Sequence, residues 1–144
     1  MKKIICIVGI VLLANCARAQ KIDSSNVPDV IKKSFTKIFP GIGTVKWEKE
    51  KNDYEVSFKK DKHDMSALFM NDGMLMETET DIAVTALPAN VIEYLKNHYK
   101  GKVIKEAAII IKSNGEKNYE AEVDNVDIIF DASGKFLKEV KEND

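Results

Sequence analysis

Apolar and polar positions follow a helical period in two stretches of the chain and a strand period in most of the rest. The first helical stretch spans residues 27–41, and its pattern returns 60 positions later at residues 87–101 without a gap. In both copies the apolar side chains fall three or four positions apart, which predicts one buried stripe on an amphipathic helix. Phe35 and Leu95 occupy matching places in these stripes, so we expect both to pack onto strands.

Proline and glycine mark the ends of both predicted helices. Pro28 and Pro88 stand where a first helical residue can lack its N–H without losing a hydrogen bond. Gly41 and Gly101 stand where a helix can end in a left-handed residue. Residues 21–26, before the first helix, are polar and predict a short mobile lead-in.

Alternating apolar and polar residues predict four strands after each helix. Asn71-Asp72-Gly73 is typical of a hairpin turn, because these residues tolerate positive φ angles. The predicted strands after the first helix are residues 45–50, 54–58, 65–70 and 74–80, and those after the second are residues 102–112, 118–123, 126–131 and 135–141.

The chain therefore predicts two similar units, residues 27–80 and 87–141. Tyr54-Glu55-Val56 aligns with Tyr119-Glu120-Ala121 at an offset of 65, so insertions fall in loops. Units of about sixty residues predict a single continuous sheet rather than two independent domains. We expect an α+β fold: a tandem repeat of a helix plus four antiparallel strands, forming one antiparallel sheet with both helices on one face.

The chain combines the two proline-led helices with Trp47, the strand at residues 54–58 and Phe69 four residues before Gly73. Together these motifs resemble the PepSY-like family of small exported proteins, which are described as β-lactamase-inhibitor-like. The resemblance implies a tandem fold like that of the β-lactamase inhibitory protein, whose concave sheet face grips a partner. It implies no established biochemical activity. That inhibitor has disulfides, whereas this chain has no cysteine after residue 16, so inhibition of a β-lactamase is not expected from the resemblance.

The first 19 residues have the pattern of a signal peptide. Lys2 and Lys3 precede an apolar run at residues 4–14, and Ala17-Arg18-Ala19 provides a cleavage site. We expect a PepSY-like domain at residues 20–144 that is periplasmic or secreted. Acylation of Cys16 after cleavage as a lipoprotein is the alternative.

Composition argues against several classes of function for the exported chain. Both cysteines, Cys6 and Cys16, lie in the predicted signal peptide, so thiol nucleophiles and disulfides are not expected after cleavage. Removal of residues 1–19 leaves 19 basic and 23 acidic residues, a net charge of −4. Nucleic-acid binding needs a basic surface and is not expected. No later apolar run reaches the length of a membrane span.

Catalytic residues are not recognisable in the sequence. His63 and His98 are the two histidines, and neither belongs to a triad or a paired-histidine motif. We therefore expect no enzyme activity and no cofactor.

Two stretches suggest metal binding. Met65, Met70, Met74 and Met76 follow His63, and thioethers are soft ligands for Cu(I). Alternation places Met65 and Met70 on opposite faces of their strand, which divides such a ligand set. Methionines also fill irregular gaps in small cores, and this alternative explains them as well.

Acidic turn residues could hold calcium. Asn71-Asp72-Gly73 and residues 124–131 supply carboxylate and amide oxygens, but neither has the spaced pattern of a calcium loop. Both segments are also explained as turns, because Asp, Asn and Gly favour turn conformations. If calcium does bind weakly, Asp72 is the candidate ligand.

Several strands carry apolar residues on both alternating sets of positions. We expect the helices to cover the side that holds Val56, Phe58, Ile109 and Ile111. The opposite side then exposes an apolar patch to a partner, unless sheet curvature shields it. The predicted partner-binding residues on this open face are Leu68, Met70, Ile110, Ile129 and Leu137.

The function expected from the sequence is an exported, non-enzymatic binding module that holds a protein or peptide on the open sheet face. The alternative is an envelope sensor or chaperone for a metal ion or small molecule, with weak calcium or copper binding.

Overall fold

The computed structural model describes residues 20–141 as two helices, two short 3-10 helices and nine strands. The predicted signal peptide and the alternative at Cys16 lie outside the described residues. The helices are α1 (Asp29–Ile38) and α2 (Ala89–His98), and the 3-10 helices are η1 (Ser24–Asn26) and η2 (Val84–Ala86). The strands are β1 (Gln20–Ile22), β2 (Val45–Glu50), β3 (Asp53–Lys60), β4 (His63–Phe69), β5 (Leu75–Ile82), β6 (Ile104–Lys112), β7 (Lys117–Val123), β8 (Val126–Asp131) and β9 (Phe136–Lys141).

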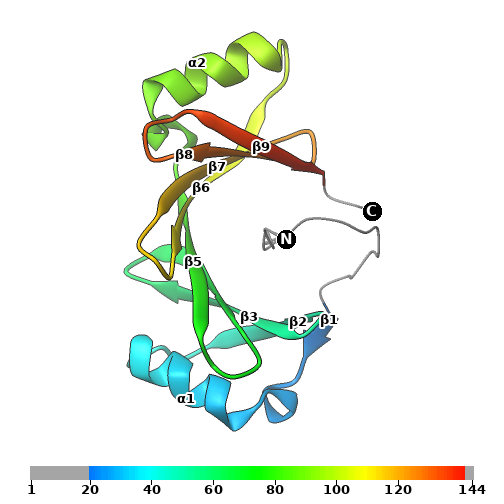
Figure 1. The fold of residues 1–144 in the computed structure, drawn as a ribbon, viewed down its shortest axis with the longest axis vertical. Coiled ribbons are helices and arrows are strands. Elements are labelled where there is room, and N and C mark those ends of the chain that lie inside the picture. Colours follow the sequence, from blue (N-terminus) through cyan, green and yellow to red (C-terminus); the bar gives the residue numbers. More distant parts are fainter. Residues whose placement is uncertain (1–19, 142–144) are drawn as a thin grey trace. The chain divides into compact units, whose positions relative to one another are not determined.

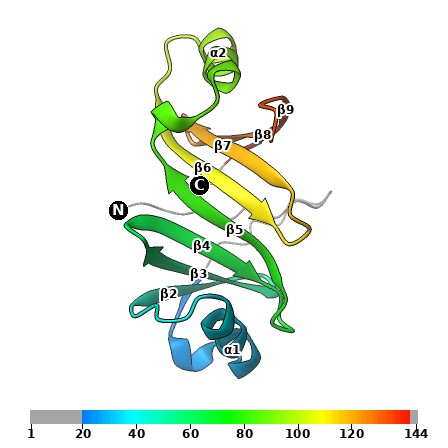
Figure 2. The same cartoon turned by 90° about the vertical axis from the view of Figure 1, so that its left-hand side faces the viewer.

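The nine strands form one antiparallel sheet in chain order, β1 to β9 (Figures 1 and 2). The α+β class and the single sheet predicted from the sequence are thus confirmed. The chain divides into two compact units at Thr78 and Glu79, inside β5. The placement of both helices on one face stays a prediction.

One predicted segment differs from the structure. Residues 20–22 form strand β1, which pairs with β2 by placing Ile22 opposite Trp47, and residues 24–26 form a 3-10 helix. The expected mobile lead-in was therefore wrong. Three residues are too few for alternation to be visible in the sequence, and the strand is stabilised by packing of Ile22 against the core of unit 1.

Unit 1 packs α1 against one side of its strands (Figure 1). The apolar stripe of the helix places Phe35 at the centre of an aromatic cluster. Its ring centroid lies 5.8 Å from that of Trp47, 5.2 Å from Phe58 and 6.4 Å from Phe69. The predicted burial of Phe35 is confirmed. This cluster is the core of the unit, because aromatic side chains bury large apolar areas.

Unit 2 packs α2 against β6, β7 and β8 through a more aliphatic core. Leu95 is buried in it, as predicted, together with Val91, Ile128 and Phe130. Tyr94 stacks on Phe136 of β9 with ring centroids 5.2 Å apart. The helix thus reaches the last strand through an aromatic contact at the edge of the core.

The helix ends follow the proline and glycine pattern with one correction. Pro28 and Pro88 are N-caps rather than first helical residues, and the carbonyl oxygen of each accepts the first hydrogen bonds of its helix. Gly41 and Gly101 have φ angles of 80° and 74°, the left-handed conformation that was predicted.

Each unit also holds its helix from a hairpin turn. A Cβ atom at Gly73, in the β4–β5 turn, would lie 3.0 Å from Val30 Cγ2 of α1. A Cβ atom at Gly134, in the β8–β9 turn, would lie 2.4 Å from Asn90 Nδ2 of α2. Both turns therefore approach the first turn of a helix so closely that only glycine fits without a shift.

Candidate functional site

Each unit has a second strand face on the side away from its own helix, which we call the far face. In unit 2 the register places Glu120 opposite both Ala108 and Ile129, and Asn118 opposite both Ile110 and Asp131. The neighbouring rows contain Ala121 and Ile128, which contact the helix core. Because side chains alternate along a strand, the rows of Glu120 and Asn118 point to the far face.

The far face of unit 1 contains a matching pair. Glu55 lies opposite Leu68, just as Glu120 lies opposite Ile129 in unit 2. All four side chains are buried. A buried glutamate beside a buried aliphatic residue therefore stands at corresponding positions in the two units.

The predicted partner-binding residues divide into two groups. The first group lies on the far faces, as the alternation of side chains along the strands predicts, but it is buried. The exposed fraction is 4 % for Ile110, 2 % for Ile129 and 1 % for Leu68. Their predicted exposure was therefore wrong. Alternation assigns a side chain to one side of a sheet, but it does not encode how much solvent reaches that side.

Leu137 and Met70 remain accessible. Leu137 is 45 % exposed, and Met70, directly after β4, is half-buried. The β8–β9 register places Ile129 opposite Lys138 and Phe130 opposite Phe136, so Leu137 is the extra residue of a bulge. A bulged residue has no directly opposite side chain, and this explains its exposure.

Buried polar groups on the far faces were not predicted from the sequence. Besides the two glutamates they include Ser66, Asn118 and Asp127. Within residues 20–141, Ser66 Oγ makes no hydrogen bond and Asn118 Oδ1 accepts none, although Asn118 Nδ2 donates to Glu116 Oε1 at 3.3 Å. An unsatisfied buried polar group costs about 1–3 kcal/mol. A polar residue between two core residues of a strand is the signal that marks such positions.

Strand β9 forms one edge of the sheet. It is hydrogen-bonded to β8, and no other strand among the described residues pairs with it. Tyr99 Oη donates a hydrogen bond to Glu139 Oε2 at 2.6 Å, so the one glutamate of the strand is held by the end of α2. Burial, and then the bond to Glu139, raise the pKa of the Tyr99 hydroxyl above its usual range.

The remaining charges of β9 are positive. Lys138 and Lys141 are exposed, and the exposed Leu137 directly precedes Lys138. The edge therefore presents unpaired backbone groups, one exposed leucine and two lysines. Such an edge can add an extended segment of another chain through main-chain hydrogen bonds.

The two histidines lie apart from the far faces. The His98 ring stacks on Tyr94 with centroids 3.9 Å apart, and its Nδ1 donates to the Tyr94 carbonyl oxygen at 2.9 Å. His63 is the exposed first residue of β4, opposite Lys60. Neither histidine is placed in a catalytic arrangement by these contacts.

The candidate calcium ligand has a role in its turn. Asp72 Oδ1 accepts a hydrogen bond from the Met74 N–H at 2.9 Å. Over the described part of the chain, no group of three or more His, Cys, Asp or Glu side chains is placed to hold a metal ion. The calcium site at Asp72 stays a prediction.

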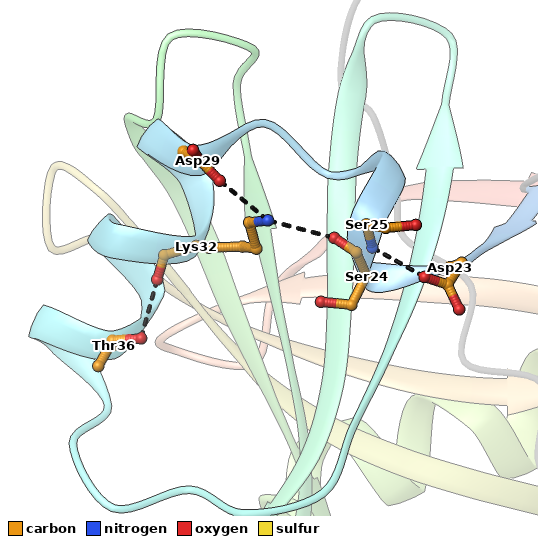
Figure 3. A network of polar contacts seen from close by, with 6 residues as sticks. All are labelled: Asp23, Ser24, Ser25, Asp29, Lys32 and Thr36. Carbon is orange, nitrogen blue, oxygen red and sulfur yellow. Dashed lines mark hydrogen bonds and ion pairs between the residues drawn. The ribbon is translucent and has the colours of Figure 1, made fainter.

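Helix α1 has a basic outer ridge formed by Lys32, Lys33, Thr36 and Lys37, which line a shallow hollow. Figure 3 shows that Lys32 is already engaged: its Nζ lies 3.0 Å from Asp29 Oδ1 and donates to the Ser24 carbonyl oxygen at 3.4 Å. The same lysine lowers the pKa of Asp29 by a hydrogen bond and by its charge. These contacts tie η1 to α1 and neutralise part of the ridge.

A family model described as "Putative beta-lactamase-inhibitor-like, PepSY-like" matches residues 13–76 and again residues 62–138. The chain belongs to the PepSY-like family. The resemblance inferred from Trp47, Phe69 and Gly73 is thus confirmed. No curated protein matches this PepSY-like chain significantly.

Solved structures share the fold of this PepSY-like protein. A "putative periplasmic" protein from Bacteroides eggerthii is 18 % identical with a TM-score of 0.71, over 79 % of this chain and 88 % of its own. A BLIP-like protein from Bacteroides fragilis is 23 % identical with a TM-score of 0.62, over 81 % and 89 % of the two chains. At these identities the likeness concerns the fold. None of the helices in residues 20–141 has the length and apolarity to cross a membrane.

Proposed function

We propose that this PepSY-like protein is an exported, non-enzymatic binding module that holds an extended, acidic segment of a protein partner along the edge strand β9. The observation that carries the proposal is the exposed Leu137 on a six-residue edge strand. The other edge strand, β1, has three residues. A longer edge offers more main-chain hydrogen bonds to an added strand.

The charge of the strand selects the partner. Glu139 keeps its charge in the hydrogen bond from the neutral Tyr99 hydroxyl, and with Lys138 and Lys141 it leaves β9 with a net charge of +1. Lysines on an edge strand disfavour pairing with a second copy, because the like charges would meet. The same lysines favour a partner strand that carries glutamate or aspartate. Leu137 supplies the apolar contact of such a complex.

Export is the second part of the proposal. The basic start, the apolar run and Ala17-Arg18-Ala19 support cleavage after residue 19. The Bacteroides eggerthii protein with the same fold is described as periplasmic. We propose a periplasmic or secreted location, with acylation at Cys16 as the alternative that the mass of the exported form distinguishes.

We also propose that the domain is a tandem repeat of two similar units. Helices α1 and α2 begin 60 positions apart, as do η1 and η2. The family model matches the chain twice, and the Glu55–Leu68 pair corresponds to the Glu120–Ile129 pair. Each unit therefore supplies one helix and its strands to a common sheet, as the repeats at residues 27–80 and 87–141 predict.

A direct binding measurement tests the edge. Fluorescence anisotropy follows a labelled hexapeptide of alternating valine and glutamate, and a second hexapeptide of alternating valine and lysine serves as the charge control. We expect the acidic peptide to bind and the basic one to fail. Binding should weaken as salt rises, because exposed charges are screened.

Matched variants locate the site. Leu137→Asp and Lys138→Glu should each abolish binding of the acidic peptide. Val103→Asp is the control, because Val103 is also an exposed apolar residue of unit 2, at 74 %, but lies before β6. Equal binding of both peptides, or equal losses in the Leu137 and Val103 variants, overturns the proposal.

A further inference from the structure

Three hairpins of the protein share one turn geometry. In each, a residue donates its N–H to the carbonyl oxygen of the residue four positions later, at 2.9 Å, and a glycine closes the turn. The pairs joined in this way are Met70 with Met74, Lys112 with Glu116, and Asp131 with Lys135. Gly73, Gly115 and Gly134 all have left-handed φ angles between 79° and 87°. This is the three-residue hairpin loop with a left-handed final residue.

Such a turn places its two flanking residues opposite each other on one side of the hairpin. In one case the result is an ion pair, with Lys112 Nζ 2.6 Å from Glu116 Oε1. In another, Asp131 Oδ1 accepts from the Lys135 N–H at 3.0 Å. The β4–β5 hairpin has two methionines at these positions, where the other two hairpins have charged residues.

Gap filling does not explain Met74, the more exposed methionine of this pair. Met74 is 60 % exposed, so its side chain completes no core. Met65 does have that role, because it is partly buried against the core of unit 1. The four methionines of this region are therefore of two kinds, one packed against the core and the others at the hairpin.

A third thioether lies on the same side. Met74 and Met76 are two residues apart, and alternation puts their side chains on one face. Met70 faces Met74 across the turn. Met70 and Met76 are both half-buried. Directly opposite residues of a hairpin have Cβ atoms about 4.5–5.5 Å apart, which flexible methionine side chains can span around one ion.

We propose that Met70, Met74 and Met76 form a binding site for one soft monovalent metal ion, Cu(I). Thioether sulfur is a soft, uncharged ligand that selects Cu(I) over the hard divalent ions. Carboxylates are not required, and Asp72 at the tip is already occupied by its turn hydrogen bond. Because side chains alternate along β4, Met65 points to the face opposite Met70 and does not belong to the site. The other three methionines share one face.

The site goes beyond the proposed peptide binding, because it lies on the β4–β5 hairpin of unit 1 and not on β9. The test is an anaerobic titration with Cu(I) in ascorbate, in competition with a chromophoric Cu(I) chelator. Every chain tested carries Cys6→Ser and Cys16→Ser, so that no thiol competes for the ion. We expect one equivalent of Cu(I) to be withdrawn from the chelator.

Leucine variants identify the ligands, since leucine keeps the size and apolarity of methionine without its sulfur. Met70→Leu, Met74→Leu and Met76→Leu should each weaken the affinity by about tenfold or more, because loss of even an outer-shell partner of a metal ligand costs about 10–100-fold. Met65→Leu is the control and should bind like the parent chain. Circular dichroism checks that all four remain folded.

NMR with Ag(I), a soft ion that undergoes no redox cycling, provides a second readout. The methyl signals of Met70, Met74 and Met76 should shift on addition of one equivalent, and that of Met65 should not. Failure to withdraw Cu(I), or an equal effect of Met65→Leu, overturns the proposal. Acidic-peptide binding at β9 is measured on the same variants and should be unchanged, so the two proposals can fail separately.

Discussion

Asn90 Nδ2 donates a hydrogen bond to the carbonyl oxygen of Ser133 at 2.8 Å, and this bond joins the first turn of α2 to the β8–β9 turn. The next residue, Gly134, has a φ of 79° and no room for a Cβ atom beside the Asn90 amide. The helix position, the turn and the glycine therefore depend on one another.

Gly134→Ala should destabilise the protein more than Gly115→Ala. Both glycines are left-handed, but a Cβ atom at Gly115 meets nothing within 4 Å. The Gly115 variant therefore bears only the backbone strain, about 1–2 kcal/mol. The Gly134 variant must also displace Asn90 and lose its hydrogen bond, which adds about 1 kcal/mol. Chemical denaturation measures both.

A double-mutant cycle isolates the contact. In an Asn90→Ala background, the cost of Gly134→Ala should fall to that of Gly115→Ala, because the clash is gone. A cost that stays the same in both backgrounds would show that Asn90 is not the constraint.

Phe35→Ala and Leu95→Ala should each reduce the free energy of unfolding by about 2–5 kcal/mol. Phe35 contacts four aromatic rings, and Leu95 is 2 % exposed in the aliphatic core. Val30→Ala is the helix-surface control and should cost less, since Val30 is one of the exposed apolar residues. Equal melting temperatures for Phe35→Ala and the parent would contradict this packing.

Ile110→Lys should unfold the protein or weaken it by several kcal/mol, because it places a charge at a buried position opposite Asn118. Leu137→Lys should leave the melting temperature almost unchanged, since surface substitutions cost about 0.5 kcal/mol or less. Thermal melts of the two variants decide between a buried and an exposed far face. A stable Ile110→Lys variant would instead support the exposed far face that the sequence predicts.

Glu50→Gln should stabilise the protein at neutral pH. Glu50 lies opposite Asp53 in the β2–β3 hairpin, and Glu50 Oε2 is buried without a hydrogen bond from any described residue. Burial, partly offset by Lys51, raises the pKa of Glu50, and burial raises that of Asp53. A raised carboxyl pKa means that the folded state binds protons more tightly than the unfolded state.

The sign of the pH effect follows. The penalty of the Glu50 charge is absent below the usual carboxyl pKa and grows as pH rises through the raised value. The gain from Glu50→Gln should therefore be present at pH 7 and vanish near pH 3. Lys49→Gln, on the opposite side of the same strand, is a control that should not show this pH dependence. A Glu50→Gln gain of equal size at both pH values would rule out the charge as the cause.

The helices were predictable from the sequence because their signals are redundant. In α1 the apolar stripe, Pro28 and Gly41 all agree, and Phe35 is buried as the stripe requires. Strand β8 was predicted with its exact bounds, since Val126–Asp131 lies between two turns rich in Asp, Asn and Gly. Strand β1 was missed because its stability depends on Trp47, 25 positions after Ile22.

The candidate site was less predictable. The alternation of side chains correctly assigned Ile110 and Ile129 to the face away from the helix. Their burial depends on tertiary packing, which this alternation does not encode. The accessible Leu137 owes its exposure to a bulge, and a bulge shifts register without a sequence signal of its own.

The proposed methionine site depends on a turn that the sequence predicts. Asn71-Asp72-Gly73 is a three-residue loop with glycine last, so the flanking Met70 and Met74 must face each other. Alternation within one strand relates Met70 only to Met65, on the opposite face, and does not reveal that Met70 faces Met74. Turn length, read together with strand parity, is the signal that finds it.

The order of the strands affects how fast the chain can fold. Every strand is hydrogen-bonded to its neighbours in the sequence, from β1 to β9, so no pairing has to wait for a distant segment. The longest connections are those that contain the helices, between Ile22 and Val45 and between Ile82 and Ile104. Short loops lose little entropy on closure, and folding rates rise as contacts become more local. A nine-stranded sheet of this order should therefore fold faster than a Greek-key sandwich of similar length.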